Sequence, residues 1–346
     1  DAIYNRGNHL FQDGDLVAAI AHYEQALEID SGYANASYNM AIACERMGNQ
    51  EQSIESYKQT LKIKPHFAEA HNNLGNVLQI KKDLDGAENH YKQALKIRPH
   101  FAEAHNNLGN VLREKNDFEA ATKSFKMAIE YKADFADAYN NLGITLSNVG
   151  HPEAAIDSYR EALRIKPDFA KAYLNMGNSL SQKGFLKAAI NSFKEAIKIN
   201  PNYSVAYNNM SSALISGAEI KAALVSCKKA LKINPNDSDA AWNLSGLAKN
   251  ISESVNSLER CLQADQTHLK AKLTLSALRY YQGDKSSFNQ LMQSDFKDHP
   301  LVRSFAWAFS LQELPELHFH RWALFDSVIG QSELTRPFYE FGVWRG

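Results

Sequence analysis

Eight asparagines recur at a constant interval and form the chain's most distinctive chemical pattern. They lie 34 residues apart, at Asn5, Asn39, Asn73, Asn107, Asn141, Asn175, Asn209 and Asn243. Asparagine is a mediocre helix former because its side chain competes for backbone hydrogen bonds, so eight of them in one helical column carry a cost. Each amide offers one acceptor and two donors, which match the C=O and N–H groups of an extended peptide. This column, which we call the asparagine ladder, therefore predicts a surface that holds a peptide backbone with little regard for its side chains.

The ladder also has a purely structural explanation. In that explanation the amides bond to neighbouring helices and pin successive repeats to one another. Further amides lie beside the ladder and one helical turn beyond it, as second candidates for either a groove or a solvated helix face: Asn72, Asn106, Asn140, Asn208, Asn76, Asn110 and Asn178. For any single asparagine both explanations stay open, and for the column as a whole the sequence favours groove binding.

No other group of residues in the repeats predicts catalysis or metal binding. His71 and His105 share one column, but residues of successive repeats lie too far apart to hold one metal ion, so we expect a groove or packing role. The three cysteines, Cys44, Cys227 and Cys261, occupy columns that elsewhere hold apolar or aromatic residues, and we expect them in the core. No nucleophile–base pair stands out, so the sequence predicts no catalytic residue and no metal site.

The repeat that positions these residues is a pair of helices. The segment PHFAEAHNNLGNVL occurs at Pro65–Leu78 and again at Pro99–Leu112, 34 residues later. Apolar spacing predicts one helix over about residues 68–81 and a second over about 84–97, which the next proline ends because it lacks a backbone N–H. Gly75 predicts a close approach of the paired helices, and Tyr91 is expected to fill the space between neighbouring units. No unit can bury its apolar face alone, so stacking must supply the core.

The columns of small and large residues resemble the tetratricopeptide repeat. In one unit they are Leu74, Gly75, Leu78, Ala87, Tyr91, Ala94 and Pro99, and the pattern covers residues 1–266 as about eight units. The resemblance implies an all-α solenoid, a right-handed superhelix of helix-turn-helix repeats, with the ladder in a concave groove that binds an extended peptide or protein segment. The ladder is similar to that of the O-linked N-acetylglucosamine transferase arm, where such asparagines grip peptide substrates. A dicarboxylate clamp is excluded, because the column beside the ladder holds no basic residue.

The repeat pattern fades towards the C-terminus. The eighth unit is shortened between residues 241 and 254, a degenerate repeat and capping helices are expected over 267–310, and a linker helix leads into a short strand within 311–346. The segment RPFYEFGVWRG predicts a buried strand over 338–343 with glycines after it. It resembles the first motif of S-adenosylmethionine-dependent methyltransferases, in particular the macrocin O-methyltransferase-like branch. The resemblance implies a longer parent in which Glu340, Gly342 and Gly346 bind S-adenosylmethionine, while this chain, which stops at the motif, binds no cofactor.

Composition and charge exclude several classes of partner. A net charge of −1 favours neither nucleic acid nor an anionic membrane, and the apolar runs are too short to span a bilayer. Three scattered cysteines favour a reducing compartment, so we expect a cytoplasmic protein. The chain begins with Asp inside a repeat, so we expect a fragment. Three functions of the parent stay open, namely a methyltransferase with a peptide-recruiting arm, a non-enzymatic scaffold, and an N-acetylglucosamine-type glycosyltransferase. The sequence predicts no oligomeric state.

Overall fold

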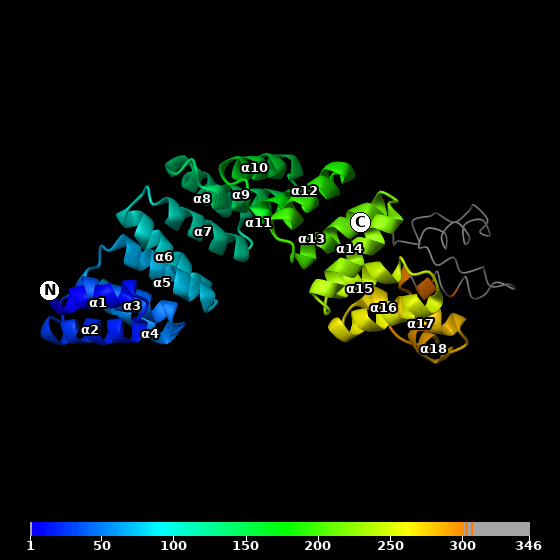
Figure 1. Ribbon diagram of the computed structural model, residues 1–346, viewed down its shortest axis with the longest axis horizontal. Coiled ribbons are helices and arrows are strands. Elements are labelled where there is room, and N and C mark those ends of the chain that lie inside the picture. Colours follow the sequence, from blue (N-terminus) through cyan, green and yellow to red (C-terminus); the bar gives the residue numbers. More distant parts are fainter. Residues whose placement is uncertain (1, 301, 304–305, 307–346) are drawn as a thin grey trace. The chain divides into compact units, whose positions relative to one another are not determined.

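The computed structural model describes residues 2–300, 302–303 and 306, and across these residues the regular secondary structure is entirely α-helical. Consecutive helices within the same compact part of the chain pack in pairs as helical hairpins (Figure 1). The first helices of the pairs are α1 (Ala2–Gln12), α3 (Ala34–Arg46), α5 (Ala68–Ile80), α7 (Ala102–Glu114), α9 (Ala136–Asn148), α11 (Ala170–Gln182), α13 (Ser204–Ser216), α15 (Ser238–Ser245) and α17 (Leu269–Tyr281). The second helices are α2 (Leu16–Ile29), α4 (Gln50–Ile63), α6 (Leu84–Ile97), α8 (Phe118–Tyr131), α10 (Pro152–Ile165), α12 (Leu186–Ile199), α14 (Ile220–Ile233), α16 (Ile251–Ala264) and α18 (Ser286–Met292). The predicted all-α repeat fold is confirmed.

The second helices begin and end at residues whose local chemistry favours a boundary. Asp83 caps α6, because its side-chain oxygen accepts a hydrogen bond from the Gly86 N–H at 2.9 Å. The helix ends at Ile97, two residues before Pro99, which cannot donate to a helical carbonyl. The predicted bounds of this helix match, whereas α5 ends at Ile80, one residue earlier than predicted, because the chain turns there towards α6.

The turn between the two helices of a repeat contains one residue with left-handed backbone. Four of the 34-residue repeats place glycine at this position, namely Gly14, Gly48, Gly150 and Gly184, and the shorter ninth hairpin places Gly283 there. Three repeats place another residue there, and Lys82, Asn116 and Ala218 adopt φ angles of 64°, 63° and 59°. A residue with a Cβ atom is strained in this region and glycine is not. The packed helices therefore impose the turn conformation even where the local sequence does not favour it.

Contacts between a glycine and an aromatic ring set the distance between the helices of a pair. A Cβ atom added at Gly75 would lie 2.7 Å from Cε1 of Tyr91, and one added at Gly143 would lie 2.5 Å from Cε1 of Tyr159. The Tyr91 ring is fully buried, and its core cluster includes Leu108 from the following repeat. Successive repeats therefore share one core, which confirms the prediction that stacking supplies it.

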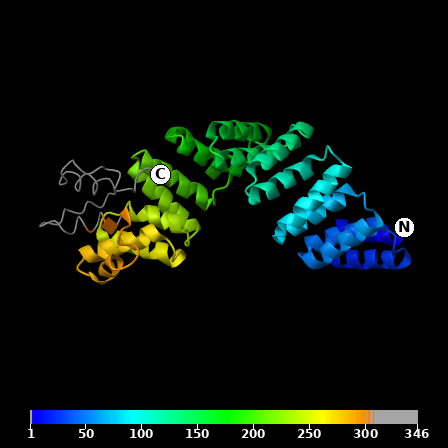
Figure 2. The same ribbon diagram turned by 180° about the vertical axis from the view of Figure 1, so that it is seen from behind.

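The chain divides into two compact units, Asp1–Ser179 and Leu180–Gly346. Within each unit the hairpins follow one another in chain order, as Figures 1 and 2 show from opposite sides. In the first unit α1 contacts α3, α5 contacts α7 and α7 contacts α9, and in the second unit α13 contacts α15. Across the described residues, no two successive second helices approach each other as closely. The first helices therefore form the tighter side of each unit, which we call the first-helix face.

The last hairpins depart from the repeat pattern. Helix α15 has 8 residues, against 13 in α13, and α17 and α18 form a ninth hairpin in which α18 has 7 residues. These short helices agree with the shortened eighth unit and the degenerate ninth unit that the sequence predicts. The domain boundary predicted at residue 266 stays a prediction. The linker helix and the strand predicted within residues 311–346 lie outside the described residues.

Candidate functional site

The asparagine ladder places one amide on each of the first helices α1, α3, α5, α7, α9, α11, α13 and α15. Seven of the eight side chains are half-buried, and Asn5 is exposed. The residue after a ladder asparagine is a core residue in most repeats, for example Leu74 and Leu108. Adjacent positions of a helix point in different directions, so the ladder lies at the edge of the core rather than within it.

Six ladder amides donate a hydrogen bond to the preceding repeat. In each case Nδ2 donates to a side chain 35 residues earlier: Asn39 to Tyr4 at 3.0 Å, Asn73 to Tyr38 at 2.9 Å, Asn107 to Asn72 at 3.1 Å, Asn141 to Asn106 at 3.0 Å, Asn175 to Asn140 at 3.0 Å and Asn243 to Asn208 at 2.9 Å. Three of them donate a second bond to a residue 31 positions earlier: Asn39 to Asn8 at 2.9 Å, Asn107 to Asn76 at 3.0 Å and Asn243 to Ser212 at 2.9 Å. The ladder thus pins successive first helices together, as its structural explanation predicts.

The two adjacent asparagines of HNNLGN make this network continuous. In α5 and α7 the first asparagine donates from Nδ2 to Oδ1 of the second, over 3.2 Å for Asn72 and 3.4 Å for Asn106. Combined with the bonds between repeats, this gives one chain of hydrogen bonds that runs from Asn141 through Asn106, Asn107, Asn72 and Asn73 to the Tyr38 hydroxyl. Linked amides polarise one another and restrict each other's rotation, so the chain fixes how each amide is oriented.

The asparagines beside the ladder are buried. Asn72 and Asn140 are 6% exposed, and Asn106 and Asn208 are 7% exposed. They therefore form neither a solvated helix face nor an open groove surface, which corrects both suggestions made from the sequence. The physical reason is that their oxygens accept the hydrogen bonds donated by the ladder amides of the next repeat.

The asparagines one turn beyond the ladder are also engaged in internal hydrogen bonds. Asn76 accepts from the Tyr91 hydroxyl at 2.8 Å and from Asn107 at 3.0 Å. Asn110 accepts from Nη2 of Arg113 at 3.2 Å. Asn76 thus accepts the second hydrogen bond of the next ladder amide, Asn107, whereas the oxygen of Asn110 is occupied by Arg113.

Two ladder amides keep both kinds of hydrogen-bonding group open. Asn141 and Asn175 each donate one N–H to the preceding repeat, and within the described part of the chain neither Oδ1 atom accepts a bond. An amide has two N–H donors, so each retains one donor as well. Asn107 differs, because both of its N–H groups donate and its Oδ1 accepts from Asn106. The ladder therefore contains amides fully occupied by the fold and amides that can still pair with a peptide group.

Comparison with family models agrees with this architecture. Models described as the tetratricopeptide repeat match residues 1–65, 66–134, 136–169, 170–203 and 204–237. The chain belongs to the tetratricopeptide-repeat family. It is accordingly a helical scaffold of the protein-binding type. A sequence search of curated proteins finds no match.

Solved structures similar to this chain have low sequence identity to it, and two of them share its fold with TM-scores above 0.5. The structure of pilF from Pseudomonas aeruginosa is 19% identical over 61% of this chain and 96% of its own, with a TM-score of 0.54. The Cut9–Hcn1 hetero-tetramer of APC/C supplies a chain that is 14% identical over 80% of this chain and 55% of its own, with a TM-score of 0.58. YrrB, described as a TPR protein with an unusual peptide-binding site, is 23% identical over 54% of this chain and 96% of its own, with a TM-score of 0.46.

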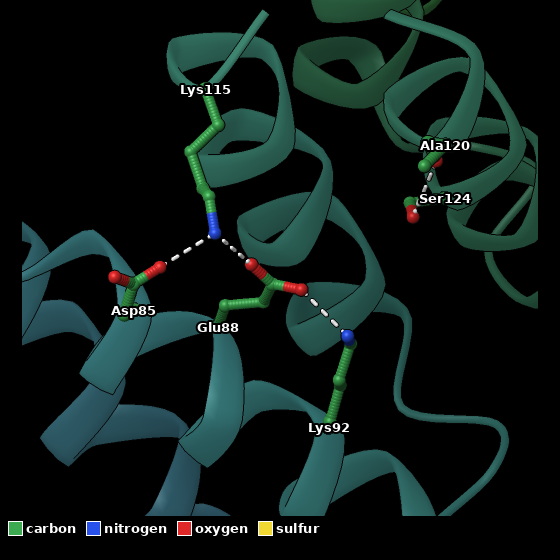
Figure 3. Close-up of polar contacts among 6 residues, drawn as sticks. All are labelled: Asp85, Glu88, Lys92, Lys115, Ala120 and Ser124. Atoms are coloured by element: carbon green, nitrogen blue, oxygen red, sulfur yellow. Dashed lines mark hydrogen bonds and ion pairs between the residues drawn. The ribbon is translucent and has the colours of Figure 1, made fainter. Parts of the chain in front are cut away.

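Ion pairs connect successive tetratricopeptide repeats on their polar surface. Lys115, which follows α7, bonds to Asp85 at 2.6 Å and to Glu88 at 2.7 Å on the preceding second helix (Figure 3). These two carboxylates raise the pKa of Lys115. One turn before a ladder position on α7, Glu103 pairs with Lys132 at 2.9 Å, and this hydrogen bond lowers the pKa of Glu103. Because that carboxylate already has a cationic partner, it adds little net field beside the ladder.

The other residues singled out from the sequence have packing roles. Nε2 of His71 lies 3.2 Å from the Pro65 carbonyl, and Nε2 of His105 lies 2.9 Å from the Pro99 carbonyl. The predicted core positions of the cysteines are confirmed, because Cys44, Cys227 and Cys261 are all buried. Across residues 2–300, no three side chains of the metal-binding types come together as a possible metal site.

The residues predicted to bind S-adenosylmethionine, Glu340, Gly342 and Gly346, lie outside the described residues, so their role stays a prediction.

The described helices can also be compared with what a membrane span requires. None of the helices within residues 2–300 combines the length and the apolar character that crossing a bilayer requires.

Proposed function

We propose that the chain binds an extended peptide or protein segment along its first-helix face, and that Asn141 and Asn175 contact the backbone of that segment. The observation that supports this proposal is the open carbonyl and N–H group on each of these two amides. Such a pair complements the N–H and C=O that one residue of an extended segment presents on the same side, so each amide can form two hydrogen bonds with one residue of the bound backbone. Recognition of this kind selects an extended backbone rather than a particular side-chain sequence.

The hydrogen bonds to the preceding repeat prepare these amides for binding. A free side chain loses rotamer freedom when it binds a ligand, and that loss opposes association. Asn175 is already held at 3.0 Å by Asn140, which is itself buried, and Asn141 is held in the same way by Asn106. The structural role of the ladder therefore supports its binding role instead of replacing it.

Replacement of both open amides by alanine tests the proposal. The probe is a fluorescein-labelled peptide of alanine and serine, which offers a backbone but no charged side chain, and its binding is measured by fluorescence anisotropy. Four lost hydrogen bonds at about 1 kcal/mol each set an upper limit of about a thousandfold, and the loss of one or two of them corresponds to about tenfold. We therefore expect the double variant Asn141→Ala/Asn175→Ala to bind between about tenfold and about a thousandfold more weakly.

Asn107→Ala is the matched control. It removes the same residue type from the same column and breaks hydrogen bonds to the preceding repeat, but it removes no free N–H donor and no oxygen without a partner. We expect this variant to lose thermal stability and, because it frees only the Asn106 amide that holds Asn141, to lose less affinity for the peptide than the double variant. The proposal is wrong if the wild-type chain does not bind the peptide, or if the double variant binds as well as wild type with unchanged helicity in circular dichroism.

We propose a second role, in which this scaffold recruits the substrate of a methyltransferase domain encoded in the same gene. The segment EFGVWRG at the end of the chain supports this role over a purely structural scaffold or a glycosyltransferase arm. In that role Glu340, Gly342 and Gly346 would hold S-adenosylmethionine once the domain is complete. The gene sequence beyond residue 346 is the test, since alternating strands and helices support the proposal and an early stop codon contradicts it.

A further inference from the structure

Lysines gather on two second helices of the second compact unit. Residues 183–232 contain eight lysines and two glutamates, which gives this segment a net charge of +6. Six of the lysines repeat with the 34-residue period, three on α12 and three on α14, and all six are exposed: Lys187, Lys194, Lys198, Lys221, Lys228 and Lys232. We call this surface the lysine face.

The helical period places these lysines on one surface. Within each helix they are 7 and 4 residues apart, so they lie along one side of it. Helices α12 and α14 both pack against α13, and they have the same length and the same register within the repeat (Figure 1). The lysines of the two helices therefore form two neighbouring rows on the outer side of the second helices, away from the asparagine ladder on the first helices.

The charges of the lysine face oppose helix stability. Other repeats place an acidic residue in the first turn of the second helix, where it interacts favourably with the helix dipole, namely Glu51, Asp85, Glu119 and Glu153. Helices α12 and α14 have no acidic residue there, and Lys187 and Lys221 take its place. Like charges four residues apart on each helix add repulsion. The fold alone therefore gives no reason for this arrangement.

Intramolecular ion pairs neutralise little of this charge. In the preceding repeat, Arg160 and Arg164 occupy two of the same columns, and each pairs with an acidic residue of its own helix, over 2.9 Å and 2.8 Å. Across the described residues, the lysine face has one ion pair, between Lys198 and Glu195 at 3.6 Å. An exposed surface with this excess of positive charge attracts a partner of negative charge.

The chain carries the complementary charge in its first two repeats. Residues 13–45 contain six acidic residues and no lysine or arginine, so their net charge is −6. Glu24 and Glu28 are exposed on α2, and neither pairs with a cation among the described residues. They occupy the same columns as Lys194 and Lys198, so they also lie on the outer side of a second helix. We call Glu24 and Glu28 the acidic face.

We propose that the lysine face binds the acidic face of a second copy of this chain, so that copies associate head to tail. The charges of the two segments are equal and opposite, and complementary charge sets which surfaces meet and in which orientation. The contact joins two unlike surfaces, so each added copy leaves one face of each kind open for the next. This association uses the second helices and is independent of the proposed peptide binding.

Charge reversal on either face tests the proposal. Lys194→Glu/Lys228→Glu reverses the centre of the lysine face, and Glu24→Lys/Glu28→Lys reverses the acidic face. Lysine and glutamate have similar helix propensities and all four side chains are exposed, so both variants should fold, which circular dichroism checks. Tag-free chains are compared by sedimentation velocity over a range of protein concentrations, in about 20 mM and about 500 mM NaCl.

Lys123→Glu/Lys126→Glu is the matched control. It changes the net charge as much as the lysine-face variant does, and its two positions are exposed on α8, away from both faces. We expect the wild-type chain and this control to associate as protein concentration rises in low salt, and to be monomeric in high salt. Each face variant alone should associate at least about tenfold more weakly, because attractive pairs become repulsive.

An equimolar mixture of the two face variants identifies the occupant. Each variant keeps the face that the other has lost, so the mixture should regain the association that each lacks alone. The proposal is overturned if the wild-type chain is monomeric in low salt, if high salt does not reverse its association, or if the control associates as weakly as the face variants. It is equally overturned if the mixture of folded variants stays monomeric, since the lysine face then does not recognise the acidic face.

Discussion

Ala218 is strained in the turn between α13 and α14, and its replacement by glycine should stabilise the hairpin. Its φ angle is 59°, in the region that four other repeats fill with glycine. The left-handed conformation destabilises the folded state by about 1–2 kcal/mol for an L-residue. Glycine avoids this strain but costs about 0.5–1 kcal/mol, because it loses more conformational freedom on folding. The side chain of Ala218 is exposed, and the turn bonds from Ala218 N to the Ile215 carbonyl at 3.0 Å and from Glu219 N to the Leu214 carbonyl at 2.8 Å involve only backbone. We therefore expect Ala218→Gly to stabilise the hairpin by about 0.5–1 kcal/mol.

Amide hydrogen exchange measures this gain where it occurs. Repeat arrays open locally, so the protection of α13 and α14 amides should rise about two- to fivefold, with little change in α1–α6. Lys228→Gly is the control of opposite sign, because it puts glycine at an exposed position in the middle of α14 and should cost about 1 kcal/mol. If Ala218→Gly lowers protection as Lys228→Gly does, the assignment of strain to this turn is refuted.

Three further predictions concern a cap, an ion pair and pH. Phe185 is 56% exposed at the N-cap of α12 and makes no capping bond, so Phe185→Asp should stabilise the protein by about 1 kcal/mol, seen as a higher melting temperature. Val149→Lys should create an ion pair with Glu119, 30 residues earlier, because Lys115–Asp85 (Figure 3) and Lys81–Glu51 have this spacing. The gain should be about 0.5 kcal/mol in low salt and should disappear in urea titrations at about 1 M NaCl. Burial lowers the pKa of His90 to about 4, so the fold favours its neutral form and stability should fall as the pH drops below the unfolded pKa of about 6.5. With the partial exposure of this side chain taken into account, the loss should be about 1 kcal/mol by pH 5. In urea titrations at several pH values, His90→Ser should reduce the dependence of stability on pH.

Much of the fold could be predicted because each repeat restates the same physical requirements. The glycine and tyrosine columns predict close helix pairs, and the structure shows why: a Cβ atom at Gly75 would overlap the Tyr91 ring. Proline after the second helix fixes its end, so the bounds of α6 match the prediction. The turn was harder to predict, because Lys82 adopts a glycine-like conformation under the constraint of the helices around it and its identity gives no sign of this.

The site was only partly predictable, since its hydrogen bonds depend on how one repeat sits on the next. The sequence places the ladder correctly on the first helices, but it does not give the acceptors, which lie 35 and 31 residues earlier. A usable signal was present, because the column before the ladder is Tyr4 and Tyr38 in the first two repeats and asparagine in the next three. Hydroxyls and amides are both acceptors. The contact between His71 and His90, whose Nδ1 atoms are 2.9 Å apart, was missed for a related reason, since only one of these residues lies in the column that drew attention.

Pinning and binding can coexist in one column because an amide has more hydrogen-bonding groups than one contact uses. Asn107 has acceptors at both the 35- and 31-residue offsets, and its own neighbour Asn106 donates to its oxygen, so the fold occupies it completely. Asn175 has isoleucine at the 31-residue offset and leucine in place of a neighbouring asparagine, so the fold takes one donor and leaves the rest. The residues around each ladder position therefore determine which amides remain open to a ligand. Under the proposed function, a uniform column of asparagines has different roles in different repeats because the residues around the asparagines differ.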